Sequence, residues 1–100
     1  MTTIKLDLTK REIEISKLVC VGFSSKEIAD ILCISSKTVR NHRYHIYQKA
    51  DTKTVPGLLF KCLESCLFSF EEIQEIYRFK NKSIQKSGFV RQMNALLRSA

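Results

Sequence analysis

The chain has 100 residues, in which 17 Lys and Arg outnumber 10 Asp and Glu and give a net charge of +7. This length suits one small domain with an appendage and excludes a second full domain. The positive charge favours a polyanionic partner, because each phosphate that Lys or Arg neutralises releases counterions, although a well-solvated surface alone also explains a basic chain.

The sequence lacks the usual signals of secreted, membrane and catalytic proteins. No run approaches the roughly 20 apolar residues of a membrane span, and the N-terminus has no basic region followed by an apolar core. There is no glycine-rich phosphate loop and no Gly-x-Ser-x-Gly motif, and the carboxylate pair Glu71–Glu72 falls at an expected helix start. We therefore expect a cytoplasmic protein with no membrane partner, no enzyme activity and no cofactor.

The first helix is expected over about residues 10–21. Thr9 and Glu12 form a capping box, in which the hydroxyl accepts from an early backbone amide and the carboxylate accepts from the amide of the cap. Gly22 supplies the left-handed conformation that commonly ends a helix. Apolar residues at helical spacing predict a buried stripe, formed by Ile13, Ile15, Leu18 and Val19.

Two further helices are expected at short intervals. A pair of serines precedes each one and can cap it: Ser24–Ser25 before a helix of about residues 25–32, and Ser35–Ser36 before a helix that continues to about residue 49. Both helices have an apolar side and a polar side. The three helices would therefore share one core.

A fourth, strongly apolar helix is expected after Thr54, which can cap it. Pro56 is tolerated there because the first helical residues donate no intrahelical hydrogen bond. The apolar face of this helix exceeds what a three-helix core needs to cover, so we expect part of it to meet another chain. That face consists of Leu58, Leu59, Cys62, Leu63, Cys66 and Leu67.

The cysteines are expected to be reduced and to serve packing. All four lie within apolar runs, where a free thiol behaves as a small buried hydrophobe: Cys20, Cys33, Cys62 and Cys66. The spacing of Cys62 and Cys66 differs from the Cys-x-x-Cys of common zinc sites, and neither His42 nor His45 completes a ligand set. We expect no metal site, and metal binding or redox sensing is the alternative.

The last third of the chain is expected to add one or two helices. Ser69 and Glu72 repeat the capping-box pattern, and a weaker apolar stripe begins at Phe89. No segment shows the alternation of a strand, so the predicted fold class is all-α. We divide the chain into a domain of residues 1–68 and a C-terminal extension of residues 69–100.

Short motifs occur in a fixed order between residues 8 and 49. They are Leu8–Glu12 (LTKRE), Ser25–Ala29 (SKEIA) and Ser36–His42 (SKTVRNH). Their order and spacing resemble the LuxR/GerE-type helix-turn-helix, a DNA-binding module of bacterial transcription regulators. The resemblance implies a three-helix core and a fourth helix that often carries the dimer contact. Because the motifs begin almost at Met1, we expect a freestanding module without a fused sensor domain.

The resemblance makes the third helix the recognition helix, which enters the major groove. The base-reading positions are Arg40, Asn41 and Tyr44, whose side chains suit guanine, adenine and either a thymine methyl or a phosphate, respectively. A solvated helix surface is the alternative. The residues expected on the DNA backbone are Ser25, Lys26, Lys37, Thr38, Arg43 and Tyr47.

The sequence thus predicts a bacterial transcription regulator that binds double-stranded DNA and lies on the nucleoid when bound. We expect a homodimer on an inverted repeat, with a dimer interface of Leu58, Leu59, Cys62, Leu63 and Cys66. The rival is a protein-interaction adaptor or anti-regulator that keeps the fold and binds another regulator or RNA polymerase. The extension carries basic residues and no acid from Tyr77 onward, and is expected to contact DNA, clamp the dimer or bind a partner.

Overall fold

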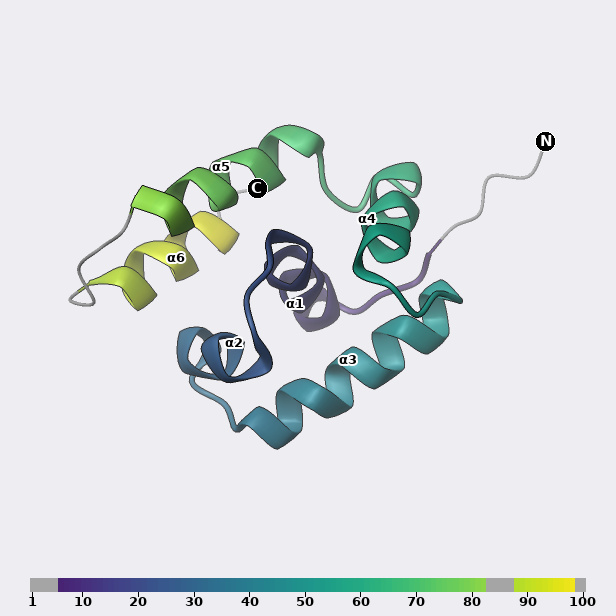
Figure 1. Cartoon of the computed structure of the whole chain (residues 1–100), viewed down its shortest axis with the longest axis horizontal. Helices are drawn as coiled ribbons and strands as arrows, with labels where there is room; N and C mark the ends of the chain where they lie inside the picture. The colour runs from purple at the N-terminus through teal and green to yellow at the C-terminus, as the bar shows by residue number, and fades with distance from the viewer. Residues whose placement is uncertain (1–5, 83–87, 99–100) are drawn as a thin grey trace.

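The computed structural model describes residues 6–82 and 88–98, which form six helices with no strand among them (Figure 1). The helices are α1 (Lys10–Val21), α2 (Ser25–Leu32), α3 (Ser36–Ala50), α4 (Val55–Glu64), α5 (Phe70–Lys82) and α6 (Phe89–Arg98). The all-α prediction is confirmed, and two helices follow the fourth. Within the described residues, no helix has the length and apolar character to cross a membrane, and no three His, Cys, Asp or Glu side chains gather as metal ligands would.

The helix α1 begins and ends at its predicted signals. The amide of Glu12 donates to Oγ1 of Thr9 over 3.1 Å, and the amide of Thr9 donates to Oε1 of Glu12 over 2.9 Å, so the predicted capping box is confirmed. Gly22 follows with a φ of +106°, a left-handed conformation that glycine adopts without steric cost. The predicted apolar stripe is buried except for Ile13, which is partly buried.

Hydroxyl caps set the starts of the next three helices. Ser24 caps α2 and Ser35 caps α3, so the first serine of each pair is the cap. Thr54 caps α4 as predicted, because its Oγ1 accepts from the amide of Gly57 over 3.1 Å. A Cβ at position 57, in the first turn of α4, would overlap the Thr52 side chain, so a larger residue there would require this side chain to move.

One core joins the first four helices. The helices α1, α2 and α3 pack against one another, and α4 packs mainly on α1. Burying an aliphatic side chain of this kind stabilises a fold by about 1.5–3 kcal/mol. The side chains at the centre are fully enclosed, and they include Ile15, Leu18, Ile28, Val39, Ile46 and Leu58.

The extension folds back onto the first two helices. Ser69 and Glu72 form the second predicted capping box, with hydrogen bonds of 2.9 and 3.2 Å. The helix α5 packs on α1 and α6 packs on α2 (Figure 1), where Asn94 donates to the carbonyl oxygen of Ile31 over 2.7 Å. The extension also contributes to the same buried cluster as the other helices, through Ile73, Ile76, Met93 and Leu97. The division of the chain at residues 68 and 69 stays a prediction.

Two expectations about the apolar residues are wrong in part. Leu58 and Cys62 were expected at a dimer interface, but both side chains are fully buried inside the single chain and present no surface to a partner. Cys33 and Cys66 were expected to be buried, but both are exposed. Each has a φ of +58°, at the point where the chain leaves a helix, so the residue lies at an exposed end of an apolar run.

The two cysteines that are more enclosed have raised pKa values. Burial raises the pKa of Cys62 to about 11, and burial together with the nearby Cys62 raises the pKa of Cys20 to about 12. Because the thiolate is the reactive and metal-binding form, these two thiols are inert at neutral pH. This agrees with a packing role.

Two ion pairs tie distant helices to α1. Lys49, in the last turn of α3, donates to Oε1 of Glu12 over 2.8 Å, and the Glu12 side chain is buried. Lys17, which is also buried, donates to Oε2 of Glu72 in α5 over 3.1 Å. Burial raises the pKa of both carboxyls, but hydrogen bonds and the neighbouring Lys outweigh it, so each pKa lies below its ordinary value.

These carboxyls make the free energy of unfolding depend on acid pH. Since each folded-state pKa is below the ordinary value of 4.5, the stabilisation is complete above pH 4.5 and is lost as the pH falls through the folded-state pKa. We expect urea denaturation to show a steeper loss of stability below pH 4.5 for the native chain than for the Glu12→Gln, Glu72→Gln variant. Equal slopes for the two proteins would contradict this assignment.

Candidate nucleic-acid interface

The helix α3 lies along one edge of the molecule, at the bottom of Figure 1. Val39, Ile46 and Ala50 form its buried side, which packs on α1 and α2. The remaining side chains lie at the flanks of this contact or face outward. The packing therefore fixes which residues of α3 a ligand can reach.

The three predicted base-reading residues share the outward side of α3. Arg40, Asn41 and Tyr44 are all exposed, and 61% of the Tyr44 surface is accessible. Their spacing brings them to one helical face, because residues three and four apart are neighbours on a helix. The hydroxyl of Tyr44 accepts from Nε2 of Gln48 over 2.9 Å, and its ring meets His45 edge-on. These contacts orient the Tyr44 ring on the helix surface.

The predicted backbone contacts come from both helices of the helix-turn-helix. Lys26 in α2 and Lys37 in α3 are exposed, whereas Ser25 and Arg43 are half-buried. The guanidinium of Arg43 donates to Oγ of Ser25 over 3.2 Å, which joins the middle of α3 to the start of α2. Sequence patterns did not predict this contact. Four of the five guanidinium N–H groups remain for other acceptors.

Thr38 is already engaged at the start of α3. Its amide donates to Oγ of Ser35 over 3.0 Å, and the two hydroxyl groups lie 2.8 Å apart in a second hydrogen bond. A hydroxyl can both donate and accept, so Thr38 can still bind a phosphate oxygen while it remains in the cap. The cap and the expected phosphate contact therefore use the same small group of atoms.

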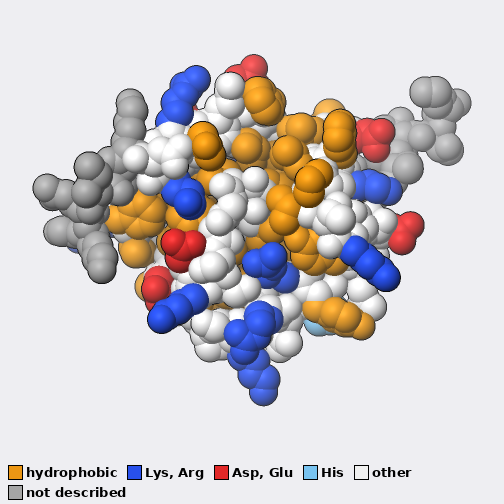
Figure 2. All heavy atoms as spheres, viewed as in Figure 1, with side chains coloured by type: hydrophobic (Ala, Val, Ile, Leu, Met, Phe, Trp, Pro, Cys, Tyr) orange, Lys and Arg blue, Asp and Glu red, His pale blue; other side chains and the backbone are white. Residues whose placement is uncertain are grey.

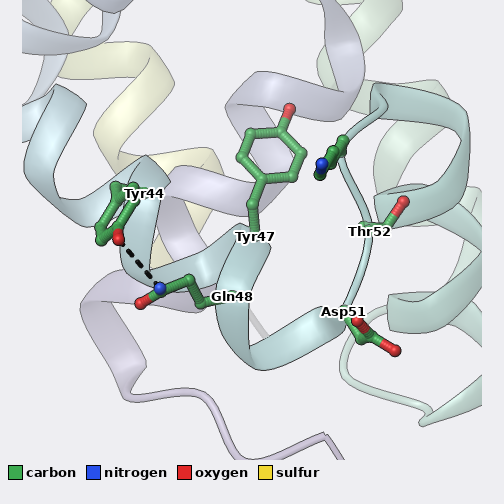
Figure 3. Close-up of a pocket in the computed structure, with 6 residues that line it drawn as sticks. Tyr44, Tyr47, Gln48, Asp51 and Thr52 are labelled. Atoms are coloured by element: carbon green, nitrogen blue, oxygen red, sulfur yellow. Dashed lines mark hydrogen bonds between the residues drawn. The ribbon is translucent and has the colours of Figure 1, made fainter.

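An open hollow of about 690 Å³ lies at the C-terminal end of α3 (Figure 3). In this view Tyr47 stands between the Tyr44–Gln48 pair on one side and Thr52 and Asp51 on the other. The hollow is lined by Tyr44, Tyr47, Gln48, Asp51, Thr52 and Lys53. Sequence patterns did not predict it, because half of its lining comes from the turn between α3 and α4.

The charge on α3 is positive throughout. The helix contains basic residues and no Asp or Glu, and Figure 2 shows Lys and Arg side chains projecting from the lower edge, where α3 lies. Lys49 is partly neutralised by Glu12, so the unpaired positive charge is concentrated toward the first half of the helix. The basic residues are Lys37, Arg40, Arg43 and Lys49. A phosphate backbone meets no carboxylate from this helix.

Comparison with known proteins identifies a family and several similar proteins. The profile of the bacterial regulatory proteins of the luxR family matches residues 6–58, more than half of the chain. The oxygen regulatory protein NreC of Staphylococcus carnosus is 44% identical over 63 residues, and NreC of Staphylococcus haemolyticus is 43% identical over 63 residues. Each alignment covers 63% of this chain and 29% of the relative, so the chain spans less than a third of the length of these proteins. No solved structure matches.

The family match covers α1, α2, α3 and the start of α4, which carry all nine residues expected on DNA. The predicted resemblance is therefore confirmed, and the exposed basic α3 is the helix that the resemblance predicts as the recognition helix. The chain belongs to the luxR family of bacterial regulatory proteins.

Proposed function

We propose that this regulator reads a specific sequence of double-stranded DNA with α3 in the major groove and acts as a homodimer on an inverted repeat. The observation that carries the first part is the common exposed face of Arg40, Asn41 and Tyr44 on an acid-free helix whose other side is buried. The major groove is wide enough for one helix and presents a distinct donor and acceptor pattern for each base pair.

The three outward residues have complementary chemistry for base reading. Arg40 can donate two parallel hydrogen bonds to guanine O6 and N7, and Asn41 can both donate to and accept from adenine. Tyr44 offers an apolar ring to a thymine methyl and a hydroxyl to a phosphate. Because Arg40 and Asn41 are adjacent in the chain, we expect them to read neighbouring base pairs.

The contacts that hold the helix on the duplex surround this face. Lys26 and Ser25 lie at the start of α2, and Lys37 and Thr38 lie at the start of α3, where backbone amides also attract anions. Arg43 links the two starts through Ser25. We assign these residues, with Tyr47, to phosphates, so they set the register of the helix and carry no sequence information.

The dimer proposal relies on the apolar surface that α4 leaves outside the core. Leu59 and Leu63 are half-buried, Cys66 is exposed, and Phe60 is 75% exposed. Figure 2 shows a broad apolar patch at the upper right, over the part of the molecule where Figure 1 places α4. A two-fold dimer through α4 would cover this patch and present two α3 helices to half-sites about one helical turn apart.

A second candidate is an adaptor that binds another regulator or RNA polymerase. The exposed Phe70 and Tyr77 of α5 favour a protein contact on the extension. We rank it below DNA reading, because a pure adaptor has no need for an acid-free, exposed α3. In either case we propose no enzymatic role, and a cytoplasmic location at the bacterial nucleoid for the DNA-bound form.

Substitutions on α3 and α2 separate base reading from phosphate binding. We expect Arg40→Ala to weaken binding to the preferred site by about 1–3 kcal/mol and to relax its specificity, because one bidentate base contact is lost. Lys26→Ala should weaken binding to all sequences alike. Fluorescence anisotropy with the preferred and a scrambled duplex measures both effects. Equal losses on the two duplexes for Arg40→Ala would reject its base-reading role.

A charged substitution on α4 tests the dimer. We expect Leu63→Glu to yield a monomer in sedimentation equilibrium and to bind a single half-site, because it places a carboxylate in the proposed interface. Tyr77→Glu, at an exposed aromatic residue of α5, is the matched control and should remain dimeric. A native chain that is monomeric both free at micromolar concentration and on DNA would overturn the proposal.

A further inference from the structure

The hairpin of α5 and α6 covers α1 and α2 on the side away from α3. In Figure 1, α1 and α2 lie between this hairpin and α3. The principal contacts of the hairpin with the first three helices are those of α5 with α1 and of α6 with α2. The outward face of α3 is therefore left open, and the hairpin is placed beside the turn that joins α1 to α2.

Three aromatic rings attach the hairpin to that turn. Phe89 of α6 stacks on Phe79 of α5, with ring centroids 5.3 Å apart, and lies 6.3 Å from the ring of Phe23. Phe23 is only 5% exposed. On the same ring, Nζ of Lys80 lies 5.2 Å from the centroid, within the range of a cation–π interaction. The ammonium group of Lys80 is thus held against the α1–α2 turn.

This position continues the DNA interface proposed above. Phe23 directly precedes the residues at the start of α2, where Ser25 and Lys26 are assigned to the DNA backbone. Arg43 of α3 donates to Ser25 in the same segment. Lys80 of α5 and Arg43 of α3 therefore each contact a residue of the segment 23–26, which itself contains Lys26 of α2. Glu27, which follows Lys26, is an acid, and its carboxylate accepts a hydrogen bond from the amide of Ser24.

The hairpin from Tyr77 onward has a composition that favours a polyanion, whereas the earlier part of α5 carries Glu71, Glu72 and Glu75. Six of the 17 Lys and Arg residues and none of the 10 Asp and Glu residues lie in residues 77–100. A lysine side chain usually loses rotamer freedom on binding, but the ammonium group of Lys80 is already held over the Phe23 ring, so this loss is smaller. The ammonium group keeps its N–H donors while it lies over a ring face.

We propose that Lys80 binds a backbone phosphate just outside the half-site read by α3, so that the C-terminal extension widens the DNA footprint. The proposal rests on the DNA reading proposed above and adds a residue that lies outside the matched helix-turn-helix. A phosphate contact of this kind carries no base specificity and responds to salt.

The test compares Lys80→Gln with Arg78→Gln on two duplexes. Both variants remove one positive charge from α5, but residues two apart point to nearly opposite sides of a helix, so Arg78 is the matched control. One duplex ends at the preferred site, and the other continues for about one helical turn, roughly 10 base pairs, on each side. Affinity is measured by anisotropy from about 50 to 200 mM salt, with circular dichroism and urea denaturation to check folding.

We expect the native chain and Arg78→Gln to bind the longer duplex more tightly than the short one, and Lys80→Gln to lose that gain. On the longer duplex, Lys80→Gln should make the negative slope of log affinity against log salt shallower by about 0.9. The loss of affinity relative to the native chain should therefore become roughly threefold smaller between the lowest and the highest salt concentration. Lys80→Arg should restore the native slope.

The outcomes separate the two proposals. If the native chain binds its preferred duplex specifically while Lys80→Gln keeps the native slope, or Arg78→Gln loses as much as Lys80→Gln, the Lys80 contact is rejected and DNA reading stands. If the folded native chain prefers no duplex, DNA reading itself is rejected, and the Lys80 proposal with it.

Discussion

The buried carboxylate of Glu12 is the interaction on which the position of the recognition helix depends. It accepts from the backbone amide of Thr9, which starts α1, and from the ammonium group of Lys49, which ends α3. One side chain therefore fixes the beginning of the first helix and the end of the third. Removing one partner from such a pair is costly, because it leaves a buried polar group without its bond.

In the middle of α3, the Arg43–Ser25 hydrogen bond joins the helix to α2. On either side of Arg43 along the helix, Val39 and Ile46 are buried almost completely on its inner side. A helix held by these contacts has little freedom to rotate, so its outer residues are preorganised. This rigidity is what a base-reading face needs, since bidentate contacts require a fixed geometry.

Local signals in the sequence predict most of the fold, whereas long-range contacts are beyond them. The capping boxes at Thr9 and Ser69 give the starts of α1 and α5 because each involves residues only three apart. The expectation of buried cysteines failed at Cys33 because it took an apolar run as buried, although the run ended at a helix terminus. The Asn94–Ile31 contact was not predicted, since nothing local relates residues 63 apart.

The candidate site also combines features that the sequence predicts with features that it does not predict. The motifs of the family give the residues of α3, and helical spacing alone places them on one face. The dimer surface was predicted too broadly, because spacing on α4 cannot distinguish the side that packs on α1 from the side left outside; Leu58 and Cys62 belong to the former. The link from α5 to the α1–α2 turn depends on Phe23, a residue that carried no functional signal in the sequence.

The extension is packed into the same folded unit as the helix-turn-helix. Its apolar residues complete a core shared with the helix-turn-helix, and its ion pair from Glu72 reaches the buried Lys17 of α1. The DNA-binding helices are thus supported from behind by the same hairpin that brings basic residues to their side. In our proposal, one element thus contributes both to stability and to electrostatic attraction to DNA.

Selection of bound sequences from a random duplex library at near-physiological salt tests the central claim most directly. A reading face fixed as described predicts strong enrichment of one sequence, arranged as an inverted repeat with half-sites about one helical turn apart. A folded protein that enriches no sequence above its salt-sensitive background would contradict the claim that α3 reads bases.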